Sequence, residues 1–182
     1  MLKVTIAFLE ICMTMLMLHC ETVKADAANT ELESQVKAAF IFNFAKFIDW
    51  PNERSASVRS PIVVCVAGAD RFGGILQQTL EGKTAHGRPF QTRLVADEKP
   101  PRTCDILFIG AGENQNVRRI LDAIRGLSVV TVSDIPEFNQ LGGMIRFFLK
   151  ENKVRFAINL DAVRAANVRV SSQLLKVSEL SK

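Results

Sequence analysis

Few side chains in this sequence could carry out nucleophilic or metal chemistry. Its 182 residues include only two histidines, at positions 19 and 86, and four cysteines, at positions 12, 20, 65 and 104. His86 lies between Ala85 and Gly87, a context more typical of an exposed turn than of a catalytic base. Ser-His-Asp catalysis, as in an exported hydrolase, would have to use this residue. No histidine-rich or paired-cysteine ligand set is present. We therefore expect no enzyme activity, no metal site and no cofactor.

Residues 144–158 have the pattern of an antiparallel hairpin that turns at residues 151–152. Pairing Leu149 with Val154 places alternate residues of the two strands on the same face. One face is then uninterrupted and apolar, with Ile145, Phe147, Leu149, Val154, Phe156 and Ile158. The opposite face carries Arg146, Phe148, Arg155 and Ala157.

On that opposite face, Arg146, Phe148 and Arg155 are the most suggestive binding residues. Two guanidinium groups beside an aromatic ring can hold a carboxylate or a phosphate. Ion pairs with a covering helix would explain the arginines equally well. Trp50, the only tryptophan, and Asn159 are further candidates for binding a ligand or a partner. A lone tryptophan is more often a core residue, and Asn159 also suits the N-cap of a helix.

Glycines follow several of the expected strands. Those at residues 68–74 and 110–112 match neither the P-loop nor the dinucleotide-binding pattern, so turn geometry is their simpler explanation. Gly142 and Gly143, just before the hairpin, indicate a bulge or a close approach of backbone.

These residues are positioned by strands that alternate with helices. Short apolar runs predict strands at 61–67, 90–95, 106–109 and 128–132. Helical patterns fall at 72–80, 116–125, 159–166 and from 171 or 172 onwards, and a charged, proline-rich loop is expected at 97–102. This order predicts an α/β fold: a single domain with a mainly parallel central sheet flanked by helices, and a C-terminal antiparallel hairpin.

A long helix is expected over residues 31–50, where Pro51 would end it. Its second half is apolar nearly all round. Such a helix either packs on two sides or offers a surface to a partner. Its phenylalanines make it a candidate interface helix, although core packing is the simpler explanation: Phe40, Phe42, Phe44 and Phe47.

Residues 1–27 have the pattern of a signal peptide. Lys3 precedes an apolar run over residues 4–18, and Ala25 and Ala27 offer the small residues that a signal peptidase reads. We expect cleavage before Ala28, which leaves one domain over residues 28–182. An uncleaved membrane anchor is the alternative, but the run is shorter than the roughly 20 residues that a spanning helix needs.

The overall composition fits one exported globular domain. A hydrophobic share of 48% and a charged share of 23% argue against disorder and against a multi-span membrane protein. The formal net charge of +4 is modest, and the expected signal peptide carries two lysines against three acidic residues. An exported domain does not meet nucleic acid, so the basic balance does not predict that partner.

Removal of the signal peptide would leave two cysteines, Cys65 and Cys104. In an oxidising export compartment they are most simply a disulfide, and two free buried thiols are the alternative. The bridge would close a loop of about 40 residues and contribute about 4 kcal/mol on a chain-entropy argument.

Several short segments, in order along nearly the whole mature chain, resemble the YfiR family of periplasmic proteins. They are VKAAF at 36–40, FIDWP at 47–51, VCVAG at 64–68, CDILFI at 104–109, TVSD at 131–134, GGMI at 142–145, VRF at 154–156, INL at 158–160 and SSQLL at 171–175. Cys65 and Cys104 fall where the family's cysteine pair would be. Some members carry a second cysteine pair around the double glycine, which this sequence lacks.

The resemblance implies a periplasmic α/β regulator that can dimerise. It implies a non-enzymatic repressor that binds the periplasmic region of a membrane-bound diguanylate cyclase and so lowers cyclic-di-GMP and biofilm signalling. It also implies an OmpA-like outer-membrane lipoprotein as a second partner, one that would relieve the repression by sequestering the protein. The alternative is a periplasmic sensor in which Arg146, Arg155 and Trp50 hold an anionic or aromatic metabolite.

Overall fold

The structure is a computed structural model of the chain, and it describes residues 29–51, 60–68, 72, 74–95 and 103–181. The predicted signal peptide at residues 1–27 and the charged loop expected at 97–102 lie outside this part of the chain. None of the helices in the described ranges is both long enough and apolar enough to span a bilayer.

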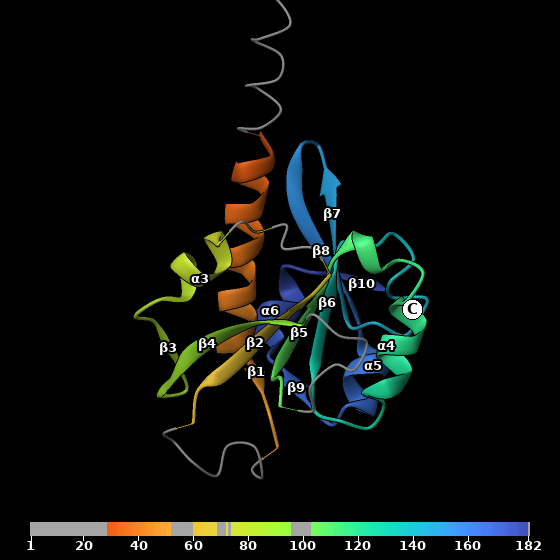
Figure 1. The fold of residues 1–182 in the computed structure, drawn as a ribbon. Helices are drawn as coiled ribbons and strands as arrows, with labels where there is room; N and C mark the ends of the chain where they lie inside the picture. The colour runs from red at the N-terminus through yellow and green to blue at the C-terminus, as the bar shows by residue number, and fades with distance from the viewer. Residues whose placement is uncertain (1–28, 52–59, 69–71, 73, 96–102, 182) are drawn as a thin grey trace, which may run out of the picture.

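A central sheet of eight strands organises the molecule (Figure 1). Its order is β10-β8-β7-β6-β5-β2-β4-β3, and the five neighbouring pairs other than β7–β8 and β3–β4 are parallel. The strands are β2 (Ile62–Ala67), β3 (Thr84–Ala85), β4 (Arg88–Val95), β5 (Ile106–Ile109), β6 (Val130–Ser133), β7 (Ile145–Lys150), β8 (Lys153–Asn159) and β10 (Glu179–Ser181). The predicted α/β class with a mainly parallel sheet and a C-terminal hairpin is confirmed.

One face of the sheet is covered by a helix over residues 29–47, drawn in orange in Figure 1. Because strand residues alternate between faces, Val64 of β2 and Phe108 of β5 both face this side. The ring of Phe44 in the helix lies 5.7 Å from that of Phe147 and 5.0 Å from that of Phe156. Helices α3 (Ile75–Leu80), α5 (Leu160–Ala165) and α6 (Ser172–Lys176) complete this core through Leu76, Leu80, Val163 and Leu174.

The other face has a separate, smaller core. Cys65 of β2 and Leu107 of β5 point to this side, where helix α4 (Val117–Ala123) packs Val117 and Ile120 on them. The loop after β6 adds Phe138, which is completely buried. Coverage of this second face is therefore centred on the middle strands of the sheet.

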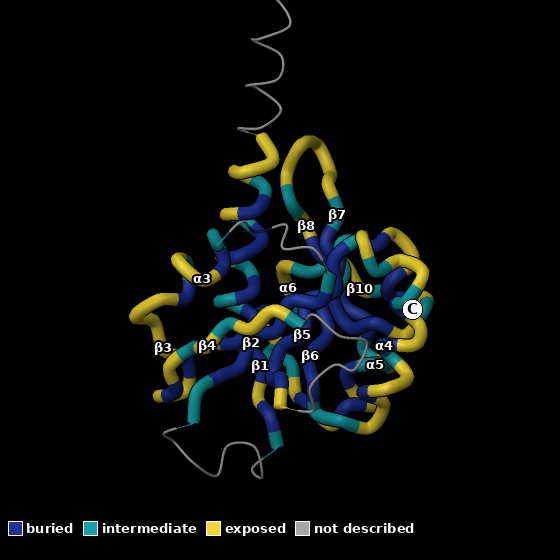
Figure 2. The backbone as a smooth tube through the Cα atoms, viewed as in Figure 1, coloured by how far each residue is buried: buried dark blue, intermediate teal, exposed yellow. Residues whose placement is uncertain are grey.

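Strands β7 and β8 form the predicted hairpin in the predicted register. Leu149 pairs with Val154 and Phe148 with Arg155. The turn residues Glu151 and Asn152 both have positive φ angles, of 52° and 55°, as a tight hairpin turn requires. The apolar face is buried at its base, but at the tip Leu149 is 58% exposed, and Figure 2 shows the tip as a projecting exposed loop.

The first helix ends earlier than expected, so its predicted extension through Trp50 was wrong. Its last helical residue is 47, and Ile48–Asp49 then forms strand β1. This strand pairs antiparallel with β9 (Arg169–Val170), near the other end of the chain. A non-local partner outweighs helical periodicity here, and the residues before a proline already disfavour helix.

Candidate binding surfaces

The open face of the β7–β8 hairpin brings together the predicted cluster and two lysines. The guanidinium carbon of Arg146 lies 4.9 Å from the ring centroid of Phe148, within cation–π range. Phe148 is directly opposite Arg155, and Lys150 is opposite Lys153 on the same face. Arg155 and Lys153 are exposed, whereas Arg146 and Phe148 are half-buried.

One of the four cations on this face has an acidic partner in the described structure. Lys150 Nζ is 2.9 Å from Glu179 Oε1 on the adjoining strand β10. Arg146, Lys153 and Arg155 make no ion pair with any residue in the described part of the chain. Ion pairs with a covering helix were one of the two explanations for Arg146 and Arg155. The described residues do not show such pairs. We name Arg146, Phe148, Lys150, Lys153 and Arg155 the basic hairpin face.

Trp50 lies elsewhere, in a pocket of about 420 Å³ beside the β1–β9 pair. Its side chain is 6% exposed, and its indole Nε1 has no hydrogen-bond partner among the described residues. The pocket is also lined by Asp49, Pro51, His86, Arg88, Asn167 and Arg169, and by none of the basic hairpin face. Strands β1 and β9 lie at the end of the molecule opposite the hairpin tip (Figure 1). The grouping of Trp50 with Arg146 and Arg155 in one site was thus wrong.

Two of the residues that line this pocket are held by bonds within the protein. Arg88 donates from Nε to the Ser60 carbonyl at 2.8 Å, and its Nη2 is 3.2 Å from Asp105 Oδ2. His86 Nε2 is 3.0 Å from the Ala45 carbonyl, in a turn with a φ of 52°. His86 is thus a turn residue tied to the first helix. Arg169 is exposed, so its guanidinium is open to a ligand at this pocket, whereas the indole N–H of Trp50 is buried.

Asn159 has a structural role. Its Oδ1 accepts hydrogen bonds from the backbone N–H groups of Asp161 and Ala162, so it caps helix α5 as predicted. Its Nδ2 donates to the Asn139 carbonyl at 2.9 Å. With 8% of its surface exposed, Asn159 has little left to offer a partner.

The phenylalanines of the first helix pack mainly inwards. Phe44 is completely buried. Phe40, Phe42 and Phe47 are half-buried and pack against the same core, with Phe42 5.7 Å from the ring of Phe90. The more exposed apolar surface near this helix is at its beginning. There Leu32 is 57% exposed and shares a groove with Leu149 of the hairpin tip.

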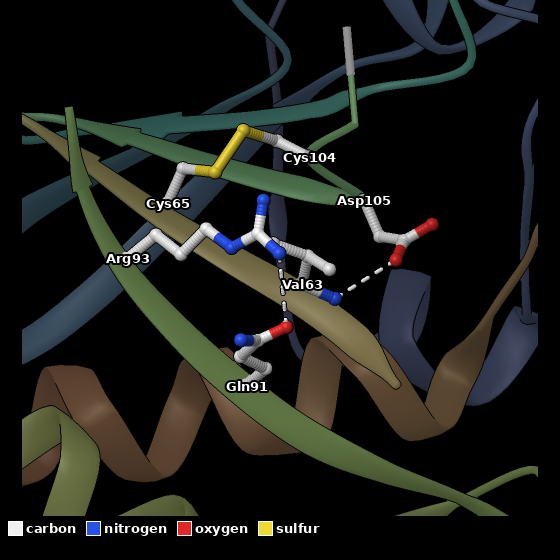
Figure 3. Close-up of a disulfide and its surroundings, with 6 residues drawn as sticks. All are labelled: Val63, Cys65, Gln91, Arg93, Cys104 and Asp105. Carbon is white, nitrogen blue, oxygen red and sulfur yellow. Dashed lines mark hydrogen bonds between the residues drawn. A yellow bond between two sulfur atoms is a disulfide. The ribbon is translucent and has the colours of Figure 1, made fainter. Parts of the chain in front are cut away.

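Cys65 and Cys104 form the predicted disulfide, with Cα atoms 5.8 Å apart (Figure 3). Both residues are completely buried. Next to the bridge, Asp105 Oδ2 accepts a hydrogen bond from the Val63 backbone N–H at 2.8 Å. The bridge thus joins the segment just before β5 to the middle of β2, beneath α4.

Sequence reasoning missed part of each surface. The predicted pairing of Leu149 with Val154 already places Lys150 and Lys153 on the same face as the arginines. Both lysines could therefore have been predicted from the sequence. The pocket of Trp50 depends on the β1–β9 pair, which joins residues about 120 positions apart and leaves no local signal.

The structure is an α/β domain with an open basic face, a small pocket and a buried disulfide. A model of the YfiR/HmsC-like family matches residues 34–179, which is most of the chain. The chain therefore belongs to this family, as the resemblance implied. Members of the family are periplasmic regulators of diguanylate cyclases, and a disulfide fits their oxidising compartment.

Proposed function

We propose that this protein represses an inner-membrane diguanylate cyclase by binding the periplasmic region of that enzyme. The observation that carries the proposal is the family match over residues 34–179. Repression would lower cyclic-di-GMP and, with it, biofilm formation. The protein would be exported with a cleaved signal peptide and would act without catalysis or a cofactor.

Binding rather than turnover also agrees with the described side chains. No cluster of three or more histidine, cysteine or acidic residues that could hold a metal occurs among them. His86, the one histidine outside the predicted signal peptide, makes its contacts with Ala45 and Asp49. The basic hairpin face, by contrast, leaves cationic groups open to a partner.

Two further partners belong to this proposal. An OmpA-like outer-membrane lipoprotein would relieve repression by sequestering the protein, and a second copy of the chain could form a homodimer. The groove that Leu32 and Leu149 share near the hairpin tip supplies exposed apolar surface for such contacts.

Affinity capture tests the proposal. The mature protein, fixed to a resin, would be incubated with detergent-solubilised inner membranes. The retained proteins would then be eluted from the resin, away from the repressor, and assayed for conversion of GTP to cyclic-di-GMP. We expect the retained fraction to have this activity and a resin that carries an unrelated periplasmic protein to have none. Equal activity on both resins, or activity on neither, would contradict the proposal.

A ligand-sensing function is the second candidate, and the unpartnered indole N–H of Trp50 favours it. A buried donor without an acceptor costs free energy, which a ligand oxygen could recover. With the Arg169 guanidinium at the same pocket, the preferred ligand would be a small carboxylate. Benzoate should raise the melting temperature of the protein and benzamide should not; Arg169→Gln should abolish the difference. Equal shifts with both compounds would argue against a carboxylate site.

A further inference from the structure

The basic hairpin face is long. Strands β7 and β8 pair over six residues, so the face extends about 20 Å at the usual rise per residue. Along β7, Arg146, Phe148 and Lys150 follow each other at two-residue intervals, about 7 Å apart. This spacing equals that of alternate side chains on an extended peptide.

The charge of this face is strongly one-sided. Its five side chains include four cations, and Glu179 is the acidic residue in contact with it in the described structure. Phe148 adds a half-exposed aromatic ring between the cationic positions. A complementary partner would be an extended segment with carboxylates at alternate positions, on the side that faces the hairpin.

An anionic membrane fits this geometry less well. The hairpin tip would approach a bilayer first, and the tip carries the exposed Glu151. The start of the first helix lies beside the tip and adds Glu31, together with Glu33, which is paired with Lys37. These carboxylates would be repelled by an anionic surface, whereas a peptide laid along the side of the hairpin avoids them.

We propose that the basic hairpin face binds an extended acidic segment of a partner protein, with carboxylates at alternate positions along that segment. The inference rests on the proposed function, because the segment would belong to the periplasmic region of the regulated cyclase. Arg155 and Lys153 bind carboxylates at two successive alternate positions, and Phe148, directly opposite Arg155, packs against the aliphatic part of the acidic side chain bound there.

Peptide binding tests this inference. The probe is a fluorescein-labelled octapeptide with glutamate at alternate positions and threonine between them, measured by fluorescence anisotropy with the mature protein. A matched peptide with glutamine in place of glutamate is the control. We expect the glutamate peptide to bind and the glutamine peptide not to bind. Because salt screens ion pairs, raising the salt concentration from 50 to 300 mM should weaken the affinity for the glutamate peptide at least tenfold, as expected for about two or more ion pairs.

Charge reversal then locates the site. Lys153→Glu with Arg155→Glu should weaken peptide binding at least tenfold, since both side chains are exposed and make no ion pair in the described structure. Arg118→Glu with Lys176→Glu changes the net charge equally at exposed positions of other elements and should alter binding less than twofold. Circular dichroism confirms that both variants are folded.

Three results would overturn the inference. In the first, the protein binds the glutamate and glutamine peptides equally. In the second, the two double variants bind the glutamate peptide equally. In the third, the protein binds phosphatidylglycerol vesicles but neither peptide. The capture experiment separates this failure from failure of the proposed function. If wild type and the hairpin variant retain equal cyclase activity, the function stands and the binding face is wrong. If wild type retains none, the function itself is wrong.

Discussion

Gly143 lies where a side chain cannot be accommodated. An ideal Cβ on this residue would be 2.3 Å from Cε1 and 2.5 Å from Cζ of Phe138. Phe138 is completely buried in the second core, so its ring has no free space into which it could move. The glycine thus permits the close approach of the segment before β7 to that core.

Gly143→Ala should therefore lower the free energy of unfolding by about 2 kcal/mol, the usual cost of overpacking a core. Gly112→Ala is the matched control, because nothing lies within 4 Å of a Cβ there and no positive φ is involved. Urea unfolding followed by circular dichroism measures both. Equal stability of the two variants would show that the Phe138 contact does not constrain Gly143.

For single residues, the sequence predicted the backbone conformation better than it predicted which side chains are in contact. The double glycine predicted a bulge or close approach, and the structure shows the latter at Gly143. The ring responsible could not be identified, because Phe138 reaches Gly143 through a loop with no periodic pattern. Trp50 was equally ambiguous: its indole is buried as a core residue would be, yet its N–H faces no acceptor among the described residues.

At the scale of elements, the disulfide ties β5 to β2. The cysteines are 39 positions apart, and the bridge should stabilise the fold by about 4 kcal/mol through the loop that it closes. Cys65→Ala with Cys104→Ala should lower the free energy of unfolding by about that amount in urea titrations. A loss below about 1 kcal/mol would show that the core holds these strands in place without the bridge.

Burial of the bridge also predicts its response to reductant. Because both cysteines are completely buried, a thiol reagent must wait for local unfolding. Dithiothreitol should reduce the native protein at least tenfold more slowly than the urea-unfolded protein, as measured by alkylation of freed thiols. Similar rates would indicate an accessible, switch-like disulfide.

Helix α5 depends on its cap. Asn159 accepts two backbone hydrogen bonds and donates a third to the Asn139 carbonyl, whereas Ser171 at α6 accepts one from Leu174 N–H at 3.3 Å. Asn159→Ala should cost about 2 kcal/mol and Ser171→Ala about 1 kcal/mol. Thermal or urea unfolding would give the order, and a reversed order would contradict the assigned roles.

The sequence predicted elements well where their signal is local. Strands β2, β4, β5 and β6, the hairpin register and the Asn159 cap all followed from periodicity and from residues next to them. Strands β1, β3, β9 and β10 were missed, since each is only two or three residues long. Strands β1, β9 and β10 also form only through distant partners. The end of the first helix was misplaced for the same reason.

At the scale of the whole molecule, the two faces of the sheet differ in how they are covered. One carries the 29–47 helix and a large core, whereas the other is closed by α4 in the middle and open over the hairpin. The family assignment followed from motifs spread along the chain. The position of the open basic face required the arrangement of helices in space, which no single segment determines.

The most direct test of the central claim is the cellular cyclic-di-GMP concentration in a strain from which the gene has been deleted. Repression of a cyclase predicts a rise of several-fold, returned to the starting level by the wild-type gene and not by the Lys153→Glu/Arg155→Glu variant. An unchanged concentration after deletion would contradict the account.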